Sequence, residues 1–311
     1  MIKKILVTGA NGDIGESVGR VLKEEFKNFV IHGTDCNGIY PGKFIFEEII
    51  TLPHADDLDY KKNIIKLLEK YDLIIPTSEF EIKAISNFST EIDISSILIL
   101  PKIYLDIFFK KYKTISFLKE HNILAPETKY INQIKECDLP IYIKPNQGAG
   151  GKGNRLLENK FDLQSAKLLP NKDWVAQEYL NGDENEYTCV IFKFNEKIQT
   201  LQLKRKLFGD RTGIAEVVNN NEIKSLLEKL SLIIDFNGSI NIQLKLTKNG
   251  PMIFEINPRL SSTVMMRNKI GFNDCIWWVK SFFKIPYTIT NNIKTGTKVY
   301  RMSNEKFCEP N

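Results

Sequence analysis

The first hundred residues alternate short apolar runs with amphipathic helical patterns, and this alternation restricts the fold more than any other feature. Apolar runs without a polar residue at every second position indicate strands buried on both faces. Such strands separated by helices are typical of a parallel, doubly wound sheet, so we expect an N-terminal α/β domain over residues 1–101. The expected strands are 5–8, 29–33, 73–76 and 97–100, and the expected helices are 14–26, 60–70 and 79–88. Ser78 and Glu81 are expected to form a capping box on the third helix.

A glycine-rich turn, Thr-Gly-Ala-Asn-Gly-Asp-Ile-Gly at residues 8–15, follows the first expected strand. Glycines there would let a phosphate approach the helix N-terminus, and Asp35 after the second strand could bind a ribose. By itself the turn fits an NAD(P)-dependent sugar reductase or epimerase. Those enzymes also need a Tyr-x-x-x-Lys pair, and no tyrosine of this chain has a lysine four residues later. A structural turn or a substrate-contacting loop is therefore favoured.

Longer strands replace the alternation after Pro101. We expect helices over 104–120 and 222–235 and strands over 141–144, 174–178, 186–194, 198–204, 239–246 and 251–256. Two hairpins are predicted, one turning at Asn195-Glu196 and the other at Asn249-Gly250. The chain is therefore expected to change from α/β to α+β beyond residue 101.

A glycine-rich loop directly follows Lys144, which ends the strand over 141–144. Its glycines are Gly148, Gly150, Gly151 and Gly153. They bring backbone N–H groups close to an anion, because no side chain blocks the approach. In a P-loop the lysine instead follows the glycines and opens a helix. The pattern favours a flexible lid over phosphate groups, and a surface loop without a ligand is the simpler alternative.

Oxygen-bearing side chains gather on the last expected hairpin. Residues two apart on a strand share a face, so Glu255 and Asn257 project to one side, with Gln243 opposite on the paired strand. Carboxylate and amide oxygens are ligands that Mg²⁺ accepts, with phosphates completing its coordination. A magnesium site is predicted here, and a solvated outer strand face is the alternative.

These motifs, in this order and spacing, resemble the ATP-grasp superfamily, and within it the carbamoyl phosphate synthetase large subunit and small carboxylate–amine ligases. The resemblance covers roughly residues 111–271. It implies a two-part ATP-grasp region, with the lid in residues 102–180 and the metal site in residues 181–311. It also implies a ligase that converts a carboxylate into an acyl phosphate and passes it to an amine, giving ADP and phosphate.

The resemblance further implies roles for individual residues. The implied ATP-binding residues are Lys111, Lys144, Gly148, Gly150, Gly151, Gly153, Glu178, Tyr179, Leu180 and Glu186. Lys110 and Lys113 are alternatives to Lys111 as the first phosphate lysine, and Glu184 is an alternative to Glu186 as the ribose carboxylate. The implied catalytic residues are Arg205 and Arg259, and the implied ligands of two Mg²⁺ ions are Gln243, Glu255 and Asn257.

Composition is consistent with a cytoplasmic enzyme that acts on small molecules. Net charge is only +5 and the lysines are scattered, so no nucleic-acid partner is expected. The five cysteines form no C-x-x-C pair, no apolar run is long enough to span a membrane, and the N-terminus has no cleavage site. The expected partners are a carboxylate and an amine, and a homodimer is compatible with the resemblance. A non-catalytic ATP-binding protein is the remaining alternative.

Overall fold

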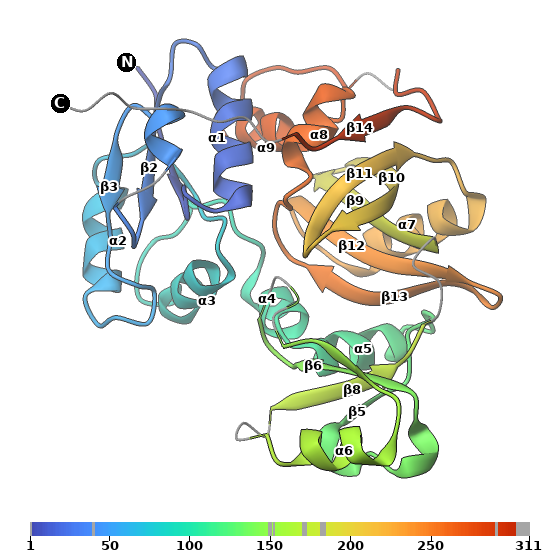
Figure 1. Cartoon of the computed structure of the whole chain (residues 1–311). Coiled ribbons are helices and arrows are strands. Elements are labelled where there is room, and N and C mark those ends of the chain that lie inside the picture. The colour runs from blue at the N-terminus through green and yellow to red at the C-terminus, as the bar shows by residue number, and fades with distance from the viewer. Residues whose placement is uncertain are drawn as a thin grey trace.

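The computed structural model describes residues 2–38, 41–148, 151, 153–169, 173–180, 185–289 and 292–302. Its N-terminal part is a four-stranded parallel sheet with strand order β3-β2-β1-β4 (Figure 1). The elements are β1 (Lys4–Thr8), α1 (Asp13–Glu25), β2 (Val30–Asp35), a 3-10 turn (Pro41–Phe44), β3 (Ile49–Thr51), α2 (Tyr60–Leu68), β4 (Leu73–Ile75) and α3 (Glu79–Phe88). The expected parallel α/β sheet is confirmed.

Helices cover both faces of this sheet because successive side chains of a strand point to opposite faces. Ile5 and Val7 of β1 share a core with Leu22 of α1. Leu6, between them, lies in a separate core with Ile64 of α2. The sheet is therefore doubly wound, as its apolar strands predicted.

Two local predictions in this part are wrong. Residues 97–100 form no strand, and Ile97 makes only an isolated parallel bridge to Ile74. Ser78 occupies the N-cap position of α3 but makes no side-chain capping bond. The carboxylate of Glu81 turns away from the helix end and accepts a hydrogen bond from Thr8 Oγ1 at 2.7 Å. The spacing of Ser78 and Glu81 therefore does not produce a capping box.

The expected helix over 104–120 is interrupted. It consists of α4 (Lys102–Phe108) and α5 (Lys111–Glu120), with Lys110 in an extended conformation between them. Asn146 causes α5 to begin anew: its carbonyl accepts from Lys111 N and its side-chain Oδ1 accepts from Tyr112 N, both at 2.9 Å. Both helices pack against strand β13 of the large sheet described below.

A small antiparallel sheet follows, with strand order β5-β8-β6-β7. Its elements are β5 (Thr128–Tyr130), two 3-10 turns (Ile131–Gln133 and Glu136–Asp138), β6 (Ile141–Pro145), β7 (Arg155–Leu157), α6 (Lys160–Lys167) and β8 (Trp174–Glu178). This sheet has its own core, in which Ile143 and Ala176 pack against Leu163 of α6. Lys144 lies on its central strand β6, paired with Val175.

The third sheet is antiparallel and has the order β13-β12-β9-β10-β11-β14. Its strands are β9 (Glu186–Phe194), β10 (Lys197–Phe208), β11 (Arg211–Val217), β12 (Gly238–Thr247), β13 (Gly250–Asn257) and β14 (Lys298–Tyr300). The helices of this part are α7 (Asn221–Ile233), α8 (Val264–Lys269) and α9 (Asp274–Phe282). Both expected hairpins are confirmed, with Asn195 and Gly250 at positive φ in the turns.

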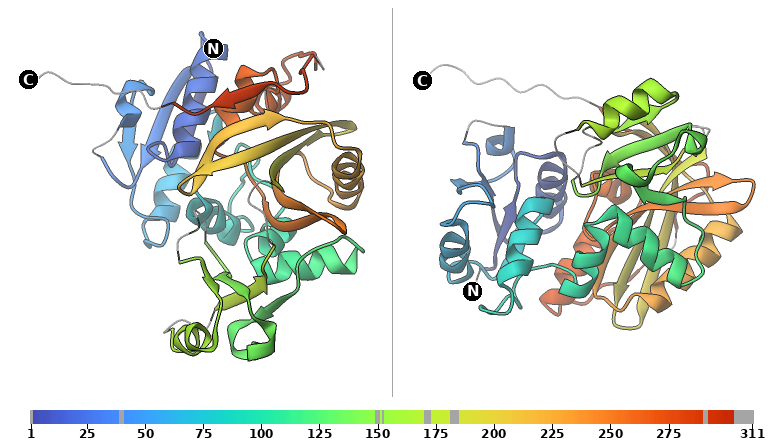
Figure 2. Two further views of the ribbon diagram at one scale, coloured as in Figure 1. Left: turned by 45° about the vertical axis from the view of Figure 1, so that its right-hand side comes forward. Right: turned by 90° about the horizontal axis from the view of Figure 1, so that it is seen from below.

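Helix α1 joins the parallel sheet to the large sheet, since it packs against α8 and α9 (Figure 2). Exposed ion pairs from Glu24 to Lys269 and from Glu25 to Lys280 lie along this junction. In the part of the chain that the structure describes, no helix is both long and apolar enough to cross a membrane. The fold therefore places the parallel sheet and the large sheet side by side, with a pocket between them.

Candidate active site

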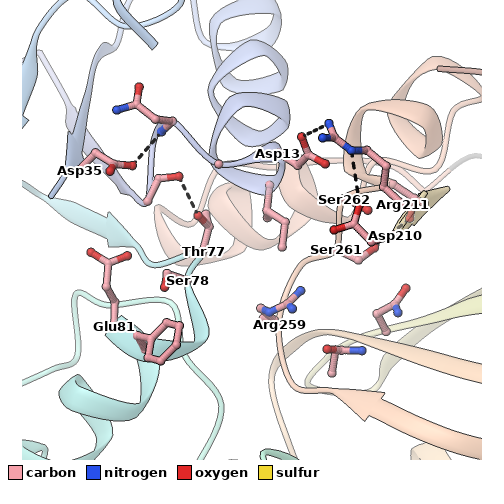
Figure 3. Close-up of a pocket in the computed structure, with 18 of the residues that line it drawn as sticks. Asp13, Asp35, Thr77, Ser78, Glu81, Asp210, Arg211, Arg259, Ser261 and Ser262 are labelled. Carbon is pink, nitrogen blue, oxygen red and sulfur yellow. Dashed lines mark hydrogen bonds and ion pairs between the residues drawn. The ribbon is translucent and has the colours of Figure 1, made fainter. Parts of the chain in front are cut away.

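A pocket of about 840 Å³ lies between the parallel sheet and the large sheet (Figure 3). On one side it is lined by residues that follow the carboxyl ends of β1, β2 and β4, which is where ligands bind in parallel sheets. These residues are Gly9, Asn11, Gly12, Cys36, Asn37, Thr77 and Ser78. The other side comes from strands β9 to β13 and from Arg259 and residues 261–263. The glycine-rich turn at residues 8–15 therefore contributes to a pocket wall.

The three predicted metal ligands all line this pocket. Glu255 lies directly opposite Gln243 in the β12–β13 pairing, and Asn257 follows Glu255 on the same face. Gln243 Oε1 accepts a hydrogen bond from Arg205 Nη2 at 3.0 Å, and Asn257 Nδ2 donates to Glu255 Oε1 at 3.1 Å. These contacts leave Glu255 Oε2 and Asn257 Oδ1 as oxygen donors, a set that fits magnesium.

A metal here would depend on amide oxygens and on ligand phosphates as well as on Glu255. Among the described residues, no cluster of three His, Cys, Asp or Glu side chains could hold an ion. That composition suits Mg²⁺, which commonly binds through one or two carboxylates together with substrate phosphates.

Buried charges surround Glu255. Burial raises the pKa of its carboxyl, but the positive charges of Lys111 and Lys144 and the hydrogen bond from Asn257 outweigh burial and hold the pKa below its ordinary value. Burial lowers the pKa of Lys144 to about 8 although the charge of Glu255 opposes the shift. Glu255 is therefore ionised at neutral pH, and Lys144 is a cation that titrates close to neutrality.

Lys111 is the buried member of the three candidate lysines. Its Nζ donates to the carbonyl of Gly148 at 2.9 Å, which joins the start of α5 to the glycine-rich loop. Lys113 is exposed and Lys110 is only partly buried. The structure therefore directs Lys111, rather than its neighbours, toward the loop.

The glycines of the loop adopt backbone conformations that other residues rarely reach. Gly148, Gly151 and Gly153 have φ of +118°, +63° and +83°, and a Cβ at Gly148 would meet no atom within 4 Å. Gly150 lies outside the described residues, as do Ala149 and Lys152. Its predicted part in the lid therefore stays a prediction.

The predicted adenine hinge does not line the pocket. Glu178 ends β8, and its backbone N–H donates to the carbonyl of Glu127 at 2.7 Å. Tyr179 and Leu180 follow, and the carbonyl of Leu180 accepts from Lys245 Nζ at 2.9 Å. The hinge follows β8 of the small sheet and contacts the large sheet through Lys245, which lies on the same face of β12 as Gln243.

The two predicted catalytic arginines line the pocket, and each is held by a carboxylate. Arg205 donates to Glu186 Oε1 from Nε at 2.9 Å and from Nη2 at 2.5 Å. Arg259 donates from Nη2 to Glu79 Oε1 at 2.7 Å. The predicted ribose carboxylate Glu186 is thus ion-paired to Arg205, and its alternative, Glu184, lies outside the described residues.

The pocket also contains residues to which the sequence assigned no ligand. The clearest is Glu81, whose carboxylate accepts from Thr8 Oγ1 and from the hydroxyl of Tyr60 at 3.2 Å. Burial raises its pKa to about 7 although both hydrogen bonds oppose the shift. Asp13 and Arg211 form an ion pair of 2.6 Å between α1 and β11 (Figure 3). The only sequence signal for Glu81 was the S-x-x-E spacing, and it pointed to a helix cap.

The ATP-grasp domain family profile matches residues 109–263. This segment contains all the candidate phosphate lysines, both arginines and the three predicted metal ligands. Residues 109–263 are an ATP-grasp domain. An uncharacterised protein of Mycoplasma pneumoniae is 26% identical over 164 residues, which cover 50% of this chain and 56% of that protein. The chain therefore matches only about half the length of this curated relative.

Several solved structures have the same fold over almost the whole chain. Carboxyaminoimidazole ribonucleotide synthase from Aspergillus clavatus, complexed with ATP, has a TM-score of 0.76 and 14% identity, covering 96% of this chain and 80% of that one. The Staphylococcus aureus N5-carboxyaminoimidazole synthetase has a TM-score of 0.73 and 17% identity, covering 95% and 80%. The biotin carboxylase domain of Hydrogenobacter thermophilus 2-oxoglutarate carboxylase, with Mg·ADP and bicarbonate, has a TM-score of 0.75 and 15% identity, covering 96% and 73%. At such identities the likeness shows the fold.

Proposed function

We propose that this protein is an ATP-dependent ligase that joins a small carboxylate to an amine. The carboxylate oxygen attacks the γ-phosphorus of ATP, which forms an acyl phosphate and releases ADP. The amine then attacks the acyl carbon, phosphate leaves, and the amine loses one proton. The observation that carries the proposal is that Glu255, which lines the pocket beside Asn257, interacts with the charges of two buried lysines, Lys111 and Lys144.

In this proposal the chain itself supplies binding and charge stabilisation. Bound Mg·ATP supplies the phosphoryl group, with Glu255, Asn257 and Gln243 as ligands of two magnesium ions. Lys111 and Lys144 bind phosphate oxygens, and the glycine-rich loop covers them and excludes water. The hinge over residues 178–180 binds adenine, and Glu186 or Glu184 contacts the ribose. Solved structures of the same fold with ATP, ADP and Mg·ADP support this assignment.

Arg205 and Arg259 are proposed to stabilise negative charge on the transferred phosphoryl group. Their carboxylate partners Glu186 and Glu79 hold both guanidinium groups at the pocket wall before any substrate arrives. Preorganised cations lose little further freedom during the reaction, which favours the transition state over the ground state. The wall formed by the parallel sheet then remains for the parts of the substrates beyond the reacting carboxylate.

A screen of ADP release tests the proposal. The full chain with Mg·ATP is incubated with a matrix of small carboxylates and amines, and ADP is measured by a coupled assay. We expect one pair to raise ADP release well above the rate without substrate. Calorimetry should show binding of Mg·ATP but not of NAD(P). Tight NAD(P) binding without ATP binding would favour a reductase or epimerase, and ATP binding without turnover for any pair would favour a non-catalytic ATP-binding protein. Action in the cytoplasm and assembly as a homodimer stay predictions.

A further inference from the structure

A fully buried ion pair lies directly behind one wall of the pocket. Arg267 of α8 is 0% exposed and Asp274 of α9 is 1% exposed. The guanidinium binds this carboxylate at both oxygens, from Nε at 3.1 Å and from Nη2 at 2.7 Å. Ser239 Oγ also donates to Asp274 Oδ2 at 2.6 Å. The contacts fix the plane of the guanidinium and therefore the direction of its remaining nitrogen, Nη1.

Nη1 of Arg267 points at two hydroxyl groups of the pocket wall. It donates to Ser261 Oγ at 2.7 Å and to Thr263 Oγ1 at 2.6 Å, and both residues line the pocket. The two hydroxyl oxygens are themselves 2.8 Å apart. Because Nη1 carries two hydrogens, each hydroxyl oxygen receives one of them.

Counting hydrogens shows what this wall offers to a ligand. Each hydroxyl has one hydrogen, and only one of the two can occupy the short contact between Ser261 and Thr263. The other hydroxyl hydrogen has no acceptor among the described residues. Ser261 is the more exposed of the two, at 6% against 1% for Thr263. The arrangement in which Thr263 donates to Ser261 therefore leaves the Ser261 hydroxyl hydrogen for the pocket.

We propose that Ser261 is a substrate-binding residue that donates a hydrogen bond to a carboxylate oxygen of the substrate, and that Arg267 is the positioning residue that makes it a donor. The inference rests on the proposed ligase function, which it deepens by assigning the carboxylate end of the substrate to this wall. Arg259, two residues before Ser261, places a cation on the same wall (Figure 3). A substrate carboxylate could accept the hydrogen bond from the Ser261 hydroxyl and also lie close to the positive charge of Arg259.

The buried ion pair of Arg267 and Asp274 is poorly explained by fold stability alone. Two charges removed from water are costly, and well-packed apolar residues often replace a buried ion pair at no loss of stability. A second arginine holds the same wall from the outside, since Arg301 donates from Nη2 to the carbonyl of Ser262 at 2.6 Å and from Nε to that of Thr212 at 3.0 Å. Arg267 and Arg301 thus hold residues 261–263 from opposite sides, which agrees with a role of this segment in binding a ligand.

Binding of bicarbonate, a small anion that presents a CO₂⁻ group like that of a carboxylate, tests the proposal. Bicarbonate is titrated by calorimetry into the full chain saturated with Mg·ADP, and the affinity for Mg·ADP is measured separately. Ser261→Ala should weaken bicarbonate binding about tenfold, the effect of one hydrogen bond to a charged group, and leave the affinity for Mg·ADP unchanged. Thr263→Ser keeps the hydroxyl and should bind bicarbonate like the wild type. Ser231→Ala is the matched control, because its buried hydroxyl donates to the Glu228 carbonyl far from the pocket.

The positioning role is tested with the double variant Arg267→Met, Asp274→Leu, which removes both buried charges together. It should remain folded by circular dichroism and bind Mg·ADP normally, but its bicarbonate affinity should fall by a similar factor to that of Ser261→Ala. Arg267→Lys, which keeps one cation, gives a second measurement if the double variant is unstable, and it should also weaken bicarbonate binding. Wild-type affinity for bicarbonate in Ser261→Ala, or no bicarbonate binding to the Mg·ADP complex, would overturn the inference. Failure of Mg·ADP to bind the wild type would instead overturn the proposed function.

Discussion

Replacement of Lys144 by Met should stabilise the ligand-free protein while impairing nucleotide binding. The ammonium of Lys144 is buried on β6, and burial lowers its pKa from 10.5 to about 8. This lowering of the pKa means that the buried charge destabilises the folded state by about 3 kcal/mol at pH 7. Met has a similar length and carries no charge, so Lys144→Met should gain up to about that amount.

The pH dependence of this gain follows from the direction of the shift. Between pH 8 and 10.5 the unfolded chain binds the Lys144 proton more tightly than the folded chain, so the wild type becomes more stable as pH rises. The advantage of Lys144→Met over the wild type should therefore be largest below pH 8 and fall below about 1 kcal/mol near pH 10.

Urea unfolding followed by circular dichroism at pH 7 and pH 10 measures the difference. Lys113→Met, at an exposed lysine of α5, is the matched control and should change stability little at either pH. The same two variants are then titrated with Mg·ATP, for which Lys144→Met should lose on the order of 2–3 kcal/mol of binding free energy. A destabilised Lys144→Met, or a gain that is equal at both pH values, would refute the reasoning that Lys144 is a buried cation held for a ligand.

Three further predictions concern neighbouring charges. Glu255→Gln should abolish ADP formation while the variant remains folded by circular dichroism, because a neutral amide cannot replace a carboxylate that binds divalent cations. Retention of near-normal turnover would contradict the metal site. The dissociation constant of Mg·ATP should rise with pH above about 8, because Lys144 then loses its proton. Calorimetry near pH 9 should detect proton uptake when Mg·ATP binds, and both effects should be absent in Lys144→Met. Since the pKa of Glu81 is raised to about 7, the folded state binds its proton more tightly than the unfolded chain does. The stability of the wild type relative to Glu81→Gln should therefore fall between pH 4.5 and 7, and equal pH profiles would show that the pKa of Glu81 is not raised.

The sequence was most informative where backbone geometry alone decides the arrangement. Period two on a strand placed Glu255 and Asn257 on one face, and the Asn249-Gly250 turn predicted the hairpin. The turn alone would set Gln243 opposite Phe254. A β-bulge at Phe254, which the local sequence does not reveal, brings Gln243 opposite Glu255. Uninterrupted apolar strands identified the parallel sheet for the same reason, since burial on both faces leaves no room for alternation.

Features that depend on distant partners could not be predicted in this way. The break between α4 and α5 arises because Asn146 caps a helix that begins 35 residues earlier, and no local pattern at residues 109–110 reveals it. Glu81 has the spacing of a capping residue, but Thr8 and Tyr60 draw its carboxylate into the pocket. The pairing of Arg205 with Glu186 likewise depends on the β9–β10 register.

The two walls of the pocket come from separate segments of the chain, one from the N-terminal part and the other from the ATP-grasp domain. Substrate preference can therefore change in evolution separately from nucleotide binding. The predicted phosphate and metal residues lie within residues 109–263, whereas Asn11, Asp35 and Glu81 lie in the N-terminal part of the chain that contains the parallel sheet. Substitutions in the loops after β1, β2 and β4 can reshape one wall without moving Lys144 or Glu255. A library randomised in those loops should therefore yield variants with altered substrate preference that still bind the nucleotide as the parent does.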